Sequence, residues 1–132
     1  MSLRPGLAAS FLIFCALASP GPAADHARET PQEVQRAVNN SKAVLLDVRE
    51  ANEWDAGHLK IAQLVPLSSL DEMTADQVAS KIPKGKVVYC HCVAGTRAAE
   101  AAGLLKKLGY DARALKPGYK ELVKAGLEPA RR

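Results

Sequence analysis

The residues of this sequence best suited to chemistry form one short loop, Cys92-Val93-Ala94-Gly95-Thr96-Arg97. Its cysteine stands between a short apolar run and a segment rich in helix-forming residues. At such a junction several backbone N–H groups can surround a sulfur atom, and the positive end of the helix dipole points at it. Both effects favour the thiolate, the nucleophilic form of cysteine. Gly95 lets the backbone turn where a side chain would block the pocket, and Arg97 can close the loop or hold an anionic group.

The same residues also invite comparison with the phosphate-binding loop of cysteine phosphatases, in which five residues separate cysteine from arginine. Here four residues separate Cys92 from Arg97, and Ala98 follows. A loop shorter by one residue suits a sulfur atom better than a phosphate with its three oxygens. The sequence also offers no obvious aspartate as a general acid. A phosphatase or arsenate reductase is therefore the less favoured enzyme class.

The neighbouring Cys90 and His91 do not complete a metal site with Cys92, because three adjacent residues lack the fourth ligand and the spacing that zinc requires. His26 and His58 have no partner that the sequence identifies, and a lone histidine is more often structural. We expect neither a metal nor an organic cofactor.

Cys90 raises a separate question. The N-terminal residues 1–24, described below, predict export, and an exported chain is exposed to oxidants. In a strand, residues two apart have Cα atoms roughly 6.6 Å apart, at the upper edge of the range for a disulfide. A strained, readily reduced bond between Cys90 and Cys92 would act as a redox latch on the nucleophile. The favoured interpretation is that Cys90 ends a buried strand with its side chain in the core.

A series of helices and strands must position this loop. Two capping boxes, Thr30 with Glu33 and Thr74 with Gln77, predict helix starts. The expected strands are residues 43–48, 62–66, 86–90 and 111–115, and the expected helices begin near 31, 75, 96 and 119. Strands that alternate with helices predict an α/β fold with a mostly parallel central sheet flanked by helices on both faces. Ligands of such folds bind beyond the carboxyl ends of the strands, which is where the loop lies.

Length and composition exclude several classes of protein. The 132 residues leave room for one domain, and 48% apolar with 24% charged residues is the usual balance of a chain that buries a core. Three cysteines are too few for a disulfide-rich mini-protein. The net charge is +4, but the charges alternate in sign along the chain. That pattern indicates a solvated surface rather than a nucleic-acid-binding patch.

Residues 1–24 are typical of a secretory signal peptide. Arg4 precedes an apolar run over residues 7–17, and small residues follow it. As a helix that run would reach about 16 Å, half of a hydrocarbon core, so no stable membrane association is expected once the signal is removed. We predict export to the periplasm and a mature domain over residues 25–132. The candidate cleavage sites follow Ala18, Ala23 or Ala24.

From about Thr30 to Pro129 the chain resembles a single-domain rhodanese, a member of the sulfurtransferase family. The resemblance lies in three places: Leu46-Asp47-Val48-Arg49-Glu50 with Glu53-Trp54 and Gly57-His58-Leu59, Val87-Val88-Tyr89 leading into the Cys92 loop, and Pro117-Gly118-Tyr119 with Ala125-Gly126-Leu127. It implies that Cys92 is a nucleophile that carries sulfur as a persulfide. It also implies that the substrate is bound by the cradle Val93, Ala94, Gly95, Thr96 and Arg97. Asp47, Arg49, Glu53 and His58 would fasten the fold near the site.

The resemblance implies an enzyme that moves a sulfane sulfur from a donor such as thiosulfate, a polysulfide or a persulfide to cyanide, a thiol or a protein acceptor. Val93 departs from the basic residue that thiosulfate-using members often carry, which makes thiosulfate a weaker candidate for the physiological donor. Pro117 stands where the family usually has a glycine, and Leu122 where a tryptophan is common. Neither departure threatens the expected chemistry. A non-catalytic rhodanese-like binding module is the alternative, and the intact Cys92, Gly95 and Arg97 argue against it.

Overall fold

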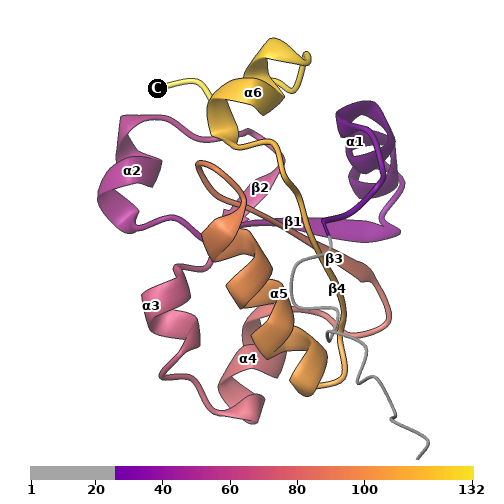
Figure 1. Cartoon of the computed structure of the whole chain (residues 1–132), viewed down its shortest axis with the longest axis vertical. Coiled ribbons are helices and arrows are strands. Elements are labelled where there is room, and N and C mark those ends of the chain that lie inside the picture. Colours follow the sequence, from indigo (N-terminus) through magenta and orange to yellow (C-terminus); the bar gives the residue numbers. More distant parts are fainter. Residues whose placement is uncertain (1–25) are drawn as a thin grey trace, which may run out of the picture.

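The computed structural model describes residues 26–132, so the expected signal peptide and its cleavage sites lie outside the described residues. Six helices and four strands follow one another along this part of the chain (Figure 1). In order they are α1 (Pro31–Asn39), β1 (Ala43–Asp47), α2 (Ala51–Ala56), β2 (Ala62–Leu64), α3 (Leu67–Leu70), α4 (Ala75–Lys81), β3 (Val87–His91), α5 (Thr96–Lys107), β4 (Asp111–Ala114) and α6 (Tyr119–Lys124). None of these helices is long and apolar enough to cross a membrane.

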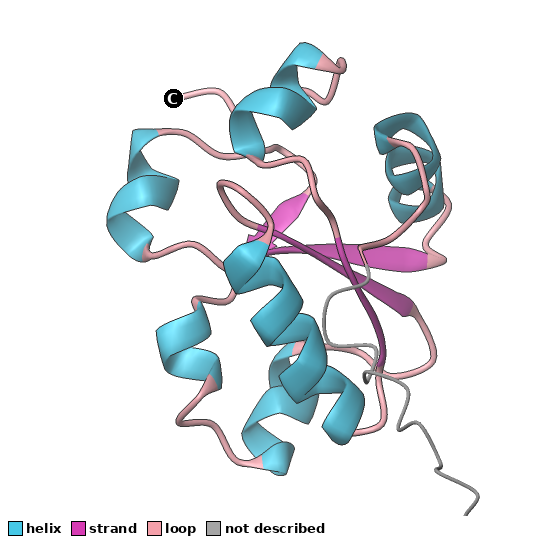
Figure 2. Cartoon of the chain, viewed as in Figure 1, coloured by secondary structure: helices cyan, strands magenta, loops and turns pink. Residues whose placement is uncertain are grey.

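The four strands form one all-parallel sheet in the order β2-β1-β3-β4. Helices α3, α4 and α5 cover one face and α1 and α6 cover the other (Figure 2). The predicted α/β fold is therefore confirmed. Asp47 pairs with His91 in the register of β1 and β3, so these two strands end side by side. The loop that follows β3 emerges at this edge.

Two apolar clusters hold the layers together. Leu46, Cys90 and Leu105 belong to the cluster between the sheet and helices α3 to α5. Leu45, Tyr89 and Leu122 belong to the cluster under α1 and α6. Because neighbouring strand residues point to opposite faces, β1 and β3 contribute to both clusters. This burial on both faces is why these strands read as continuous apolar runs.

Local sequence signals account for most of the helix starts. Thr30 accepts the N–H of Glu33 at 3.2 Å, and Glu33 accepts the N–H of Thr30 at 2.7 Å, which is the capping box predicted there. The box of Thr74 and Gln77 forms in the same way at the start of α4. The short helices α2 and α3 were not expected. Helix α2 buries none of its residues, so it carries no apolar stripe that a sequence pattern could reveal.

Both ends of the described chain are tied to the body of the domain. Near the N-terminal end, His26 forms a parallel bridge with Ala114 beside β4, and the N–H of Ala27 donates to the carbonyl of Ala114 at 2.7 Å. At the other end, Leu59 and Pro129 form an antiparallel bridge. The first of these contacts brings the start of the described chain beside the loop after β3.

Candidate active site

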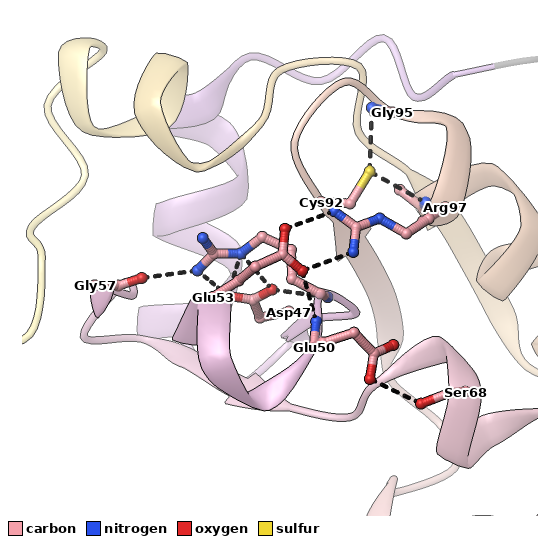
Figure 3. A network of polar contacts seen from close by, with 10 residues as sticks. Asp47, Glu50, Glu53, Gly57, Ser68, Cys92, Gly95 and Arg97 are labelled. Atoms are coloured by element: carbon pink, nitrogen blue, oxygen red, sulfur yellow. Dashed lines mark hydrogen bonds and ion pairs between the residues drawn. The ribbon is translucent and has the colours of Figure 1, made fainter. Parts of the chain in front are cut away.

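Cys92 follows directly on β3 and lies beneath the loop that leads into α5 (Figure 3). Its side chain is almost wholly buried, with 2% of the residue exposed. Its Sγ accepts the backbone N–H of Gly95 at 3.1 Å and that of Ala98 at 3.4 Å. A sulfur with two backbone donors at the start of a 12-residue helix sits where negative charge is stabilised. The loop therefore has the arrangement that its sequence predicted.

Two glycines make this loop geometry attainable. Gly95 has a φ of +91°, in the left-handed region that side chains rarely adopt. Gly118, in the turn before α6, lies so close to the loop that a Cβ there would come within 1.9 Å of the carbonyl oxygen of Val93. The N–H of Tyr119 then donates to the carbonyl of Cys92 at 3.0 Å. The turn between β4 and α6 thus braces the loop from outside.

The tip of the loop is open to solvent. Val93 is 56% exposed, and among the described residues it is the one large apolar side chain that the fold leaves exposed. Ala94 and Thr96 are exposed as well. The exposed side chain next to Cys92 is therefore apolar and not basic.

Arg97, at the end of the loop, is held by a carboxylate from α2. Its Nη1 and Nη2 donate to the two oxygens of Glu53 at 2.7 and 2.9 Å (Figure 3). The Arg97 bond lowers the pKa of Glu53 to about 2, against the opposing effect of burial. The same bond raises the pKa of Arg97. Arg97 therefore closes the loop, which is one of the two roles expected for it.

A second ion pair lies at the carboxyl end of β1. Arg49 donates from Nε and Nη2 to the carboxylate of Asp47, at distances of 2.7 to 3.1 Å. Its Nη2 also donates to the carbonyl of Gly57 at 2.8 Å, and its guanidinium lies 4.7 Å from the centre of the Tyr119 ring. This pair joins the end of the strand to α2 and α6. The fastening role implied for Asp47 and Arg49 matches these contacts.

His91 is a buried histidine next to the nucleophile candidate. Its side chain is fully buried, and its Nε2 lies 3.7 Å from the carboxylate of Asp47. Neither ring nitrogen has a hydrogen-bond partner within the described part of the chain. Burial lowers the pKa of His91, so the ring is neutral at neutral pH. It adds no positive charge beneath Cys92.

Cys90 points into the core cluster under α5 and is fully buried. Burial, with a smaller effect from Cys92, raises the pKa of the Cys90 thiol to about 12. Of the cysteines that the structure describes, Cys90 and Cys92 are both free thiols. The interpretation of Cys90 as a core residue is confirmed.

The structure shows the partners of His58 and His26, which the sequence did not reveal. His58 contacts the carbonyl of Trp54 through Nδ1 at 2.9 Å and stacks on its ring at 3.6 Å. His26 lies 3.2 Å from the carbonyl oxygen of Gly95, 69 positions away. No local pattern links residues so far apart, so the contact of His26 with the loop required the structure. No three His, Cys, Asp or Glu side chains of residues 26–132 gather as metal ligands would.

The family of the chain follows from comparison with known proteins. The model of the rhodanese-like domain matches residues 30–125, so the chain belongs to the rhodanese-like domain family. Among solved structures, protein hp1203 of Helicobacter pylori has a TM-score of 0.59 at 31% identity and covers 76% of this chain and 84% of its own. The human single-domain sulfurtransferase TSTD1 has the same fold, with a TM-score of 0.61 at 24% identity over 73% of this chain and 97% of its own.

Two curated proteins show similarity in sequence. The Bacillus subtilis protein YqhL is 40% identical over 94 residues, which cover 70% of this chain and 71% of YqhL. The probable adenylyltransferase/sulfurtransferase MoeZ of Mycobacterium tuberculosis is 34% identical over 82 residues, or 61% of this chain. The matched region spans only 20% of MoeZ, so the similarity concerns one part of that larger protein.

Proposed function

We propose that this protein is a sulfurtransferase that carries a sulfane sulfur as a persulfide on Cys92. The observation that carries the proposal is the pair of backbone N–H donors, from Gly95 and Ala98, aimed at the Cys92 sulfur. Fixed donors of this kind stabilise the negative charge of a thiolate and of a persulfide without reorganising. Membership of the rhodanese-like family and similarity to proteins named as sulfurtransferases support it.

The reaction runs in two balanced steps. The Cys92 thiolate attacks the outer sulfur of a donor persulfide, an S–S bond forms, and the donor's own S–S bond breaks to release a thiolate. In the second step an acceptor thiolate attacks the outer sulfur on Cys92. The acceptor leaves as a persulfide, and the Cys92 thiolate returns. Neither step needs an external oxidant or reductant.

The chemistry around the loop favours an organic persulfide donor, with at most one charge on its sulfane sulfur, over thiosulfate. Thiosulfate carries two negative charges, and the loop offers it little positive charge because Arg97 is already paired with Glu53. The exposed residue next to the nucleophile, Val93, is apolar. An open, apolar tip also suits a protein acceptor. We further propose, from the signal-like residues 1–24, that the protein acts after export, in the periplasm.

Mass spectrometry of the purified protein tests the proposal. After incubation with a small-molecule persulfide or thiosulfate, wild type should gain an adduct of about 32 Da, one sulfur atom, on Cys92. Cys92→Ser should gain none and should lose sulfur transfer to cyanide or a thiol while remaining folded. Cys90→Ala is the matched control and should keep the adduct. Transfer by Cys92→Ser close to wild type would refute the assignment, and a folded wild type that never accepts sulfur would favour a non-catalytic binding module.

A further inference from the structure

His26 is placed beside the loop by backbone contacts of its own segment. It forms a parallel bridge with Ala114, and the neighbouring Ala27 N–H donates to the Ala114 carbonyl at 2.7 Å. Residue 114 ends β4, whose carboxyl end lies next to that of β3. The start of the described chain is thus laid alongside the edge strand, and the His26 side chain reaches the loop from there.

The His26 ring meets the loop at Gly95. Its Nε2 lies 3.2 Å from the carbonyl oxygen of Gly95. Because a carbonyl oxygen can only accept, Nε2 carries the proton and donates. The ring also occupies the space above the Gly95 Cα, since a Cβ there would lie 2.8 Å from Nε2 and 3.2 Å from the carbonyl oxygen of Lys116. His26 and the backbone of Lys116 therefore both occupy the side of Gly95 where a Cβ would stand.

Gly95 connects His26 to the sulfur within a single residue. Its carbonyl accepts from His26, and its N–H donates to the Sγ of Cys92 at 3.1 Å. The same carbonyl already accepts the N–H of Ala99 at 3.0 Å, so α5 keeps its first-turn bond without the histidine. His26 is only partly buried and belongs to neither apolar cluster. What the ring adds is restraint on the direction of the Gly95 peptide groups.

We propose that His26 is a positioning residue for the persulfide cradle, acting through Gly95 to keep its N–H aimed at the sulfur of Cys92. This inference rests on the proposed function for its effect on turnover. The inference requires that the loop loosens when the Nε2–H donor of His26 is lost, and not only when the bulk of the ring is lost. Glutamine, whose Nε2 can take up a similar position and also donates, should replace histidine, whereas alanine should not.

Two measurements on purified protein expressed from the full chain test the inference. The first is hydrogen exchange of the Gly95 amide, followed by NMR, which reports local opening whether or not sulfur is transferred. The second is turnover with a persulfide donor. In His26→Ala the Gly95 exchange rate should rise about threefold or more, and kcat should fall about threefold with KM for the donor unchanged. His26→Gln should restore most of both. Melting temperatures identify any variant with a general loss of stability.

Gln32→Ala provides the matched control. Gln32 also lies in the N-terminal segment and also donates a side-chain N–H to a distant backbone carbonyl, that of Ala125 at 2.6 Å, but it does not touch the loop. It should leave Gly95 exchange at the wild-type rate. Unchanged Gly95 exchange in His26→Ala, or equal effects of His26→Ala and His26→Gln, would overturn the inference. Absence of sulfur on wild-type Cys92 would refute the proposed function alone, since the exchange measurement still decides the role of His26.

Discussion

Arg97 and Glu53 form a two-point ion pair that joins the end of the Cys92 loop to α2, with N–O distances of 2.7 and 2.9 Å. The two residues lie 44 positions apart, and each side chain is about two-thirds shielded from solvent. The pair therefore both closes the loop and neutralises its one arginine. The balance between these effects decides how the loop responds to pH and to anionic donors.

Replacing Glu53 by Gln should lower stability at neutral pH, and the loss should fade in acid. Folding lowers the pKa of Glu53 from 4.5 to about 2. The charged form is thus favoured by folding, and its contribution is present above about pH 4.5 and lost as the pH falls towards about 2. Urea unfolding of wild type and Glu53→Gln should show a gap of about 0.5–1 kcal/mol at neutral pH that narrows below about pH 4. Arg97→Gln should show the same narrowing, and a gap independent of pH would contradict the pairing.

Substituting Arg for Val93 should improve the use of thiosulfate. Val93 is 56% exposed beside Cys92, so a long cation fits there without disturbing the core. It would attract a dianion that the paired Arg97 attracts weakly. The apparent KM for thiosulfate should fall about threefold or more at low salt and less at high salt. Val93→Gln, which is polar and flexible but neutral, is the control. Equal effects of both substitutions would show that charge at this position is irrelevant.

Alanine at Gly118 should displace the loop. The added Cβ would lie 1.9 Å from the carbonyl oxygen of Val93. That oxygen belongs to the backbone, so rotating a side chain cannot relieve the clash. Turnover should fall about tenfold or more, because small displacements of reacting groups are costly. Gly103→Ala is the control, since that helical glycine has open space around it. It should be neutral or stabilising by up to about 1 kcal/mol. Normal turnover in Gly118→Ala would refute the bracing role of this turn.

Cys90→Ala should leave turnover close to wild type with or without reductant. The Cys90 thiol is fully buried and its pKa is raised to about 12, so it stays protonated at neutral pH and is a poor partner for disulfide exchange. Sulfur transfer by wild type and variant, each assayed with and without a reducing thiol, checks this. If sulfur transfer by wild type required reductant and transfer by Cys90→Ala did not, the redox latch would be established instead.

Much of the fold followed from short-range features of the sequence. The capping boxes at Thr30 and Thr74 marked helix starts because their bonds join residues only three apart. The apolar runs marked β1 and β3 because both faces of those strands are buried. The strand ends differ from the prediction by one or two residues. Helices α2 and α3 were not predicted, because α2 buries none of its residues and α3 is only four residues long. The loop itself was recognisable because its cysteine, glycine and arginine all lie within one six-residue segment.

The sequence by itself thus determined the order of elements and the position of the nucleophile candidate at the end of a strand. Only the tertiary structure decided which groups surround that loop. Arg97 meets Glu53, Gly118 braces Val93, and His26 reaches Gly95 from 69 positions away. Propensities and caps act over three or four residues, whereas these contacts depend on how the strands order themselves and how the helices pack on them. Tertiary packing therefore brings Arg97 to Glu53 and His26 to Gly95.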